Sequence, residues 1–139
     1  MSTEQNKARS RRFFEEVWGK GNIAVIDELT APDFVDHNAV PGLPSGVEGL
    51  KQFVVTYRSA FPDMQISVDD LIAEGDKVVI RWTARGINFG PFLGMPATGK
   101  PVTVTGITIE PKVDGMTVEG WNNFDQLGML QQMDIIPVS

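Results

Sequence analysis

Two ionisable side chains are candidates for acid–base chemistry, and the first is Asp125. It ends the stretch WNNFD at residues 121–125, which carries no other charge. If this stretch is a strand, Trp121, Asn123 and Asp125 share one face. An apolar wall there destabilises an ionised carboxylate, so Asp125 would take a proton from a carbon acid and return it to oxygen. The alternative is that Asp125 is the N-cap of a short helix at residues 127–130.

The second candidate is His37, the one histidine of the chain. Histidine is the side chain that ordinarily changes its charge near neutral pH. His37 would donate a hydrogen bond to a substrate carbonyl or pair with Asp125 across a pocket; alternatively, nearby backbone groups satisfy it at the pocket rim. Asn38 and Asn88 are candidate anchors that orient a carbonyl group or stabilise an enolate oxygen. Both asparagines also suit turns.

Aromatic residues are frequent enough in the apolar segments to form the walls of such a pocket. Together with Asn123 they would bind a small apolar or aromatic carbonyl compound. The alternative is that most of them belong to the ordinary core. The aromatic candidates for substrate binding are Phe14, Phe53, Tyr57, Trp82 and Trp121.

The composition excludes several other classes of site. The chain has no cysteine, which rules out disulfides, thiol catalysis and cysteine metal sites, and one histidine cannot make a histidine-rich metal site. A carboxylate-bound metal ion is left open, but no loop of the DxDxDG type is present to hold one. The net charge of −6 argues against nucleic acid and anionic membranes as partners. The N-terminus is polar and no apolar run has the length of a membrane span, so we expect a cytoplasmic protein.

The elements that must position these residues follow a simple order, helices first and strands second. The 139 residues suit one domain, residues 1–139. Apolar periodicity predicts three N-terminal helices and at least four strands, a plan of the α+β class. A parity change predicts a bulge at Gly106, and the pair Asp114 and Gly115 predicts a hairpin. The predicted helices cover residues 3–18, 23–29 and 47–61, and the predicted strands cover residues 64–75, 77–88, 101–113 and 116–127.

Several stretches together resemble the SnoaL-like polyketide cyclase family, within the wider NTF2-like fold. They are FVDHN (34–38), FPD (61–63), EGDKVVIRWTARG (74–86), GPFLGMPATGK (90–100), GITIE (106–110) and DGMTVEGWNNFDQLGMLQQM (114–133). The resemblance implies a cone-shaped, curved antiparallel sheet with three N-terminal helices enclosing an apolar pocket. It also implies a homodimer or a higher homo-oligomer.

The resemblance further implies a reaction. Characterised cyclases of this family close a ring by an intramolecular aldol step on an aromatic polyketide ester, without metal or organic cofactor. Their acid–base residue is the aspartate of a WxxxD element, here Asp125 after Trp121. The leading hypothesis is therefore a cofactor-free cyclase or isomerase that acts on an apolar carbonyl compound. The alternatives are a non-catalytic module that binds small molecules, and a hydrolase or hydroxylase on the same scaffold.

Overall fold

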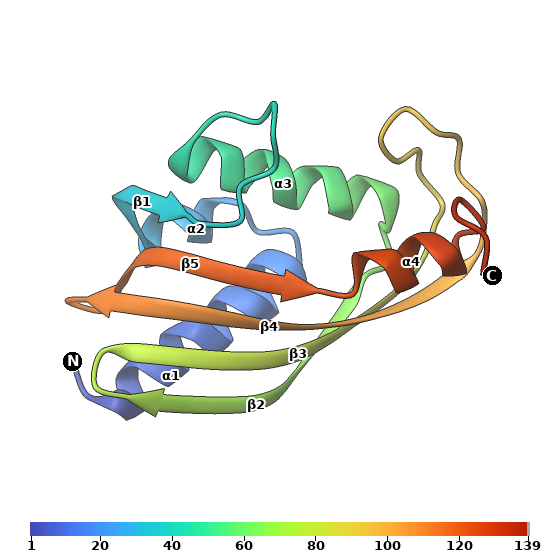
Figure 1. Cartoon of the computed structure of the whole chain (residues 1–139). Coiled ribbons are helices and arrows are strands. Elements are labelled where there is room, and N and C mark those ends of the chain that lie inside the picture. Colours follow the sequence, from blue (N-terminus) through green and yellow to red (C-terminus); the bar gives the residue numbers. More distant parts are fainter. Residues whose placement is uncertain (139) are drawn as a thin grey trace.

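The computed structural model describes residues 1–138 and consists of a five-stranded sheet with helices packed on one face (Figure 1). The three predicted N-terminal helices are confirmed, and the first is capped by Ser2, whose side chain accepts from the Gln5 N–H. The helices are α1 (Thr3–Arg12), the π-helix η1 (Phe13–Trp18), α2 (Ala24–Leu29), α3 (Gly46–Ala60) and α4 (Gln126–Gln132). The strands are β1 (Thr30–Asp36), β2 (Gln65–Glu74), β3 (Lys77–Ile87), β4 (Pro101–Val113) and β5 (Met116–Phe124).

The strands lie in the order β1-β5-β4-β3-β2, and the sheet does not close into a barrel. Strands β2 to β5 pair antiparallel, as predicted, but β1 pairs parallel to β5. The sheet is therefore mixed: the predicted antiparallel strands are confirmed, and β1 adds a parallel strand at one edge. Residues 30–36 lie outside the predicted helices and strands. The α+β class itself is confirmed.

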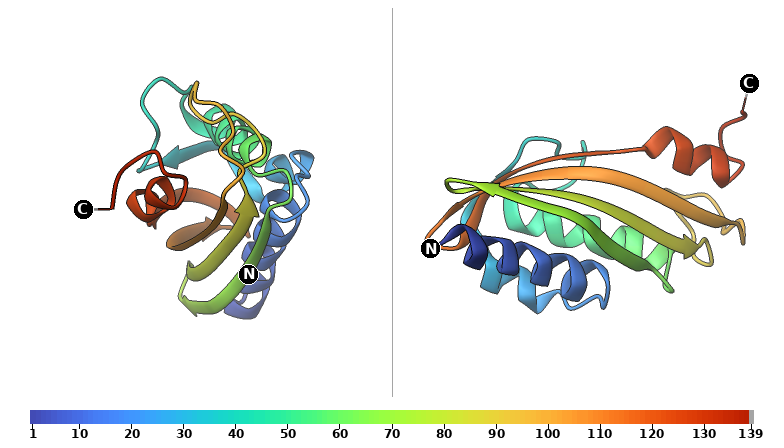
Figure 2. Two further views of the ribbon diagram at one scale, coloured as in Figure 1. Left: turned by 90° about the vertical axis from the view of Figure 1, so that its right-hand side faces the viewer. Right: turned by 90° about the horizontal axis from the view of Figure 1, so that it is seen from below.

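The sheet curves over the N-terminal helices, and α4 follows β5 and lies alongside the first residues of β4, where Gln132 hydrogen-bonds to the backbone of Thr103 (Figure 2). The pairing register shifts between Val68 and Asp70 in β2 and between Ile109 and Lys112 in β4. Such irregularities bend a strand and increase its twist. One face of the curved sheet therefore wraps around the helices, and the other face is uncovered.

The predicted bulge at Gly106 is wrong. Gly106 pairs directly with Trp82 in an unbroken β3–β4 ladder, and β4 alternates regularly between inward and outward side chains. A Cβ at Gly106 would overlap the indole ring of Trp82. Glycine is present here because a large ring on the neighbouring strand needs the space, not because the strand changes register.

The core lies between the inner face of the sheet and the helices, where Val17, Ile26, Val54 and Ile80 are completely buried. η1 lies on this side, and its wider π-helical turn places Phe13 and Phe14 among the buried side chains. Single π-helical turns are frequent at functional sites. None of the helices within residues 1–138 is long and apolar enough to cross a membrane.

Candidate functional site

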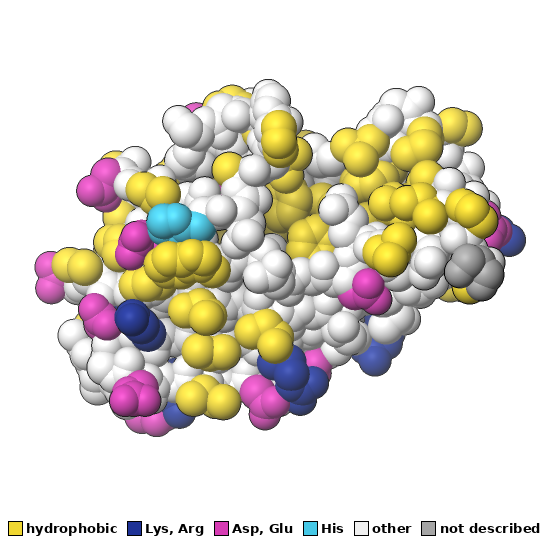
Figure 3. Space-filling model, in the orientation of Figure 1, with side chains coloured by type: hydrophobic (Ala, Val, Ile, Leu, Met, Phe, Trp, Pro, Cys, Tyr) yellow, Lys and Arg dark blue, Asp and Glu magenta, His cyan; other side chains and the backbone are white. Residues whose placement is uncertain are grey.

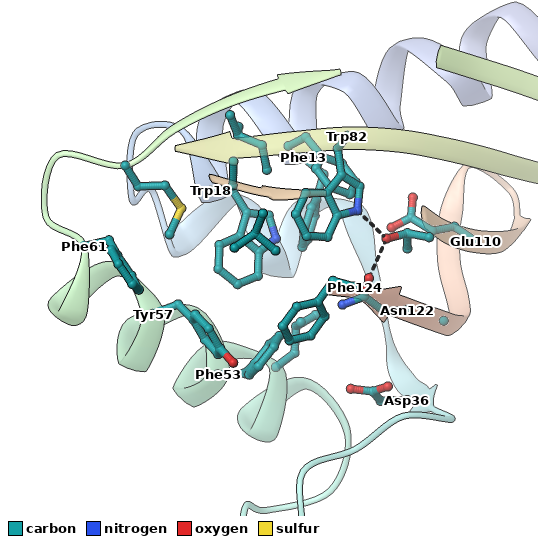
Figure 4. A pocket seen from close by; sticks show the side chains of 18 of the residues that line it. Phe13, Trp18, Asp36, Phe53, Tyr57, Phe61, Trp82, Glu110, Asn122 and Phe124 are labelled. Atoms are coloured by element: carbon teal, nitrogen blue, oxygen red, sulfur yellow. Dashed lines mark hydrogen bonds between the residues drawn. The ribbon is translucent and has the colours of Figure 1, made fainter. Parts of the chain in front are cut away.

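A pocket of about 120 Å³ lies between the inner face of the sheet, η1 and α3 (Figure 4). Its walls are mostly aromatic because the inward positions of the strands and the facing sides of η1 and α3 carry large rings. The aromatic lining residues are Phe13, Phe14, Trp18, Phe34, Phe53, Tyr57, Phe61, Trp82 and Phe124. Aliphatic lining is supplied by Leu50, Met64, Ile66, Ala84, Val102, Val104 and Met129. Such a cavity suits an apolar or aromatic ligand.

A chain of three hydrogen-bonding side chains crosses this apolar wall on β3, β4 and β5. The indole Nε1–H of Trp82 donates to Thr108 Oγ1 at 3.0 Å, and the Thr108 hydroxyl donates to Asn122 Oδ1 at 2.9 Å. Because Oδ1 accepts from Thr108, the amide orientation of Asn122 is fixed and its Nδ2 remains available to donate. The arrangement presents a fixed donor in the apolar pocket.

A carboxylate lines the same pocket. Asp36 ends β1 and pairs with Gly120 of β5, two residues before Asn122, and it lines the pocket while remaining half-buried. Its Oδ1 accepts from the backbone N–H of Asn38 at 2.9 Å, and it forms no ion pair with residues 1–138. Asp36 therefore combines a fixed position with a free carboxylate oxygen.

A second polar group lies nearer the β4–β5 hairpin. Glu110 Oε1 accepts from the Ser10 hydroxyl at 2.7 Å and lies 3.6 Å from Lys112 Nζ. Lys112 also donates to Thr117 Oγ1 at 2.8 Å. Burial lowers the pKa of Lys112, while the neighbouring Glu110 carboxylate raises it. Glu110 and Thr117 line the pocket, whereas Lys112 and Ser10 lie behind that wall.

An adjoining cavity of about 240 Å³ lies beneath the loop of residues 37–45. It adds the amide side chains of Asn38, Asn123 and Gln126 to the polar surface.

Burial raises the pKa of Tyr57 to about 12, against a smaller opposing effect of its hydrogen bond with Gln126. The two cavities share the wall formed by Asp36, Leu50, Phe53, Tyr57, Asn122 and Phe124.

The sequence profile of the SnoaL-like polyketide cyclases matches residues 8–133, which is most of the chain. The chain belongs to this family. The predicted membership is thus confirmed. None of the curated proteins matches the chain.

Solved structures of similar proteins extend this result. TsrD from Streptomyces laurentii is 29% identical, with a TM-score of 0.88 over 98% of this chain and 99% of that one. A proposed polyketide cyclase from Acidithiobacillus ferrooxidans is 33% identical, with a TM-score of 0.80 over 96% of this chain and 98% of its own. AclR from Streptomyces galilaeus, a proposed hydroxylase, is 25% identical, with a TM-score of 0.87 over 99% and 86% of the two chains.

The predicted position of Asp125 in the pocket of this SnoaL-like chain is wrong. Asp125 is exposed and forms the N-cap of α4, where its Oδ1 accepts from the Gly128 N–H at 2.9 Å. It lines neither cavity. The helix-cap alternative considered for this residue is the observed arrangement.

Trp121 and Asn123 share the outward face with Asp125, so the face assigned to the pocket was the wrong one. Trp121 is 38% exposed and stacks on the His37 ring, with ring centroids 4.2 Å apart. His37 Nε2 lies 3.1 Å from Glu119 Oε1, and the histidine lines neither cavity. Asn123 lies beside the outer cavity only. No contact joins His37 to Asp125, and the predicted pairing across a pocket is wrong.

The two other predicted anchors have different positions. Asn38 Oδ1 accepts from the Asn122 N–H at 2.6 Å, so Asn38 fixes the strand that carries the pocket amide and also lines the outer cavity. Asn88 is completely buried and lies outside both cavities. It donates to the carbonyls of Ala60 and Gly90 and accepts from Thr98. Asn88 therefore holds the loop of residues 89–100 in place.

Four of the aromatic candidates, Phe14, Phe53, Tyr57 and Trp82, do line the pocket; their role in binding a substrate stays a prediction. The sequence reasoning missed the polar lining, namely Thr30, Asp36, Arg85, Thr108, Glu110, Thr117 and Asn122. Among residues 1–138, no group of three or more His, Asp or Glu side chains is arranged to hold a metal ion.

Proposed function

We propose that this chain is an enzyme that binds an apolar or aromatic carbonyl compound and catalyses ring closure or isomerisation by acid–base chemistry, with Asp36 as the general base. The observation that carries the proposal is that the Asp36 carboxylate and the Asn122 amide both line a mostly aromatic pocket and the cavity that adjoins it. Membership of the SnoaL-like polyketide cyclase family supports the reaction class. The proposal needs no metal or organic cofactor.

The chemistry begins at a methylene group between two carbonyls, where loss of a proton gives a delocalised enolate. Asp36 takes that proton with its free carboxylate oxygen, and the Asn122 Nδ2–H donates to the enolate oxygen. The enolate carbon then attacks a second carbonyl of the same molecule and forms the new carbon–carbon bond. The resulting alkoxide recovers the proton from Asp36, so the carboxylate is regenerated.

Proton abstraction can be measured without knowing the natural substrate. In deuterated water, the protein should accelerate hydrogen exchange at the methylene of an aromatic β-keto ester, followed by NMR. Asp36→Asn should reduce the catalysed exchange at least about a hundredfold, the usual scale for a general base. The amide oxygen in that variant still accepts from the Asn38 N–H, so the local turn is retained.

Asp125→Asn is the matched control, because it removes a carboxylate from the outward face of the same protein. It should leave the exchange rate unchanged. Full exchange activity in Asp36→Asn would contradict the proposal, and binding without exchange in the wild type would instead favour a non-catalytic binding module.

A second candidate function is hydroxylation, which the similarity to AclR favours. Mass spectrometry distinguishes the two, since a hydroxylase incorporates oxygen from labelled oxygen gas and an aldol closure does not. A product that carries the label would replace the cyclase proposal.

We also propose that the protein forms a homodimer through the uncovered face of the sheet. An apolar row crosses four strands on this face, and each of its residues pairs with the next one. The row consists of Ile72, Val79, Ile109 and Trp121. Figure 3 shows hydrophobic side chains gathered on this face next to the histidine. Ile72 is 61% exposed and Ile109 is 36% exposed, so the row offers surface that a second copy would bury.

A further inference from the structure

We infer that the pocket contains a subsite for a hydroxyl group of the ligand, formed by Thr30, Glu110 and Thr117 and named here the hydroxyl subsite. The inference rests on the proposed function, in that the pocket is where the ligand binds. The strand register brings the three residues together, because Thr117 pairs with Thr30 of β1 on one side and with Lys112 of β4 on the other. All three subsite residues line the cavity near the β4–β5 hairpin.

The hydrogen bonds of the subsite leave three positions free. Glu110 Oε1 is engaged by Ser10 and Lys112, whereas Oε2 accepts no hydrogen bond from residues 1–138. Thr117 Oγ1 accepts from Lys112, so its own O–H remains available to donate. Thr30 is only 3% exposed, and its hydroxyl oxygen is buried without a hydrogen-bond partner among residues 1–138. Buried polar groups are nearly always hydrogen-bonded, so an unpaired one at a cavity wall points to a ligand.

Two donors and one acceptor complement one hydroxyl group. A hydroxyl donates a single proton, here to Glu110 Oε2, and accepts through two lone pairs, here from Thr30 and Thr117. Neither a carbonyl nor a ligand carboxylate has a proton to donate to Glu110 Oε2. Because Lys112 lies beside Glu110, the opposite charges offset each other, and the subsite favours a neutral alcohol or phenol.

The strand geometry also gives the distance between this hydroxyl and the reacting carbonyl. Glu110 and Thr108 are two residues apart on the same face of β4, which corresponds to about 7 Å. Thr108 is hydrogen-bonded to Asn122, the proposed partner of the carbonyl oxygen. The preferred ligand is therefore an aromatic carbonyl compound with a hydroxyl group at the opposite end of the ring.

The probes that test the subsite are para-hydroxyacetophenone and acetophenone, which differ only in that hydroxyl. Their affinities for the full chain would be measured by NMR titration. The wild type should bind the hydroxylated probe about tenfold more tightly. Thr30→Val keeps the β-branched shape and leaves no buried group unpaired, so the variant should fold. It should reduce the advantage of the hydroxylated probe to about threefold or less and leave the affinity for acetophenone unchanged.

Thr103→Val is the control, because Thr103 lies on the outward face of β4. It should preserve the full tenfold difference. Equal affinities of the two probes for the wild type, with both bound in the pocket, would overturn the hydroxyl subsite and leave the proposed function intact. An unchanged difference in Thr30→Val would also overturn it. If neither probe changes the chemical shifts of pocket residues, the pocket is not the ligand site. Both proposals then fail.

Discussion

Tyr57 provides a quantitative test of the apolar pocket, because it is the one tyrosine of the chain and its phenol is embedded in the aromatic wall. It is 9% exposed, and its ring centroid lies 4.8 Å from that of Phe53 and 5.1 Å from that of Phe92. Burial raises its pKa from 10.0 to about 12. A phenolate is costly there because the rings around it cannot solvate the charge.

This pKa shift makes the free energy of unfolding depend on pH. Between pH 10.0 and about 12, the unfolded chain loses the phenolic proton while the folded chain keeps it. The unfolded state then binds fewer protons, so the stability falls as the pH rises through this window. Two pH units correspond to about 2.7 kcal/mol. Tyr57→Phe removes the ionisable group, so the variant should lack this part of the decline.

Two measurements check the prediction. Phenolate absorbance, which reports on Tyr57 alone, should appear well above pH 10.0 in the folded protein. Urea unfolding curves of the wild type and Tyr57→Phe should diverge by about 2 to 3 kcal/mol across the window. Ionisation near pH 10.0, while circular dichroism shows an intact fold, would mean that water reaches the phenol and that the wall is not closed around it.

Three further predictions concern the structure around the site. Gly106→Ala should force the Trp82 ring aside and destabilise the protein by about 1 to 3 kcal/mol, measured by urea unfolding, with a shifted tryptophan emission; an unchanged spectrum would refute the packing argument. Asn88→Ala should cost about 3 kcal/mol, because it leaves the carbonyls of Ala60 and Gly90 without their partner; a loss below about 1 kcal/mol would show that water replaces the amide. Ile109→Lys should convert a dimer to a monomer in analytical ultracentrifugation, and a wild type that sediments as a monomer would refute the proposed interface.

The alternating and periodic patterns of the sequence were sufficient to predict the helices, the four antiparallel strands and the aromatic pocket wall. Strand β1 was missed because its seven residues, TAPDFVD, contain a proline and two aspartates. Apolar and polar side chains do not alternate along it. It is held by its parallel pairing with β5, far away in the sequence. No local pattern carries that information.

The inward position of Asn122 was missed because of one register shift. A two-residue turn at Asp114 and Gly115 pairs Lys112 with Thr117, and regular pairing from there would place Trp121 opposite Thr108. The shift between Ile109 and Lys112 instead places Asn122 opposite Thr108. A change of one residue exchanges the two faces of a strand, so Trp121 lies outside and Asn122 inside.

The regular alternation of β4 was a usable signal that was not followed. Val102, Val104, Thr108 and Glu110 share one parity, and with Gly106 they form a continuous inward face. Following that parity would have placed Thr108 and Glu110 in the pocket before any coordinates were known. Asp36 could not be found in this way, because its place in the pocket wall depends on the position of β1.

The most direct test of the account is a crystal structure of Asp36→Asn with an aromatic β-keto ester bound, since this variant should hold the compound without turnover. We predict that the ring lies among Phe14, Trp82 and Phe124, with a carbonyl oxygen in hydrogen-bonding distance of Asn122 and the acidic carbon facing position 36. A ligand bound on the outward face near Asp125, or in the pocket with its acidic carbon directed away from position 36, would contradict the account.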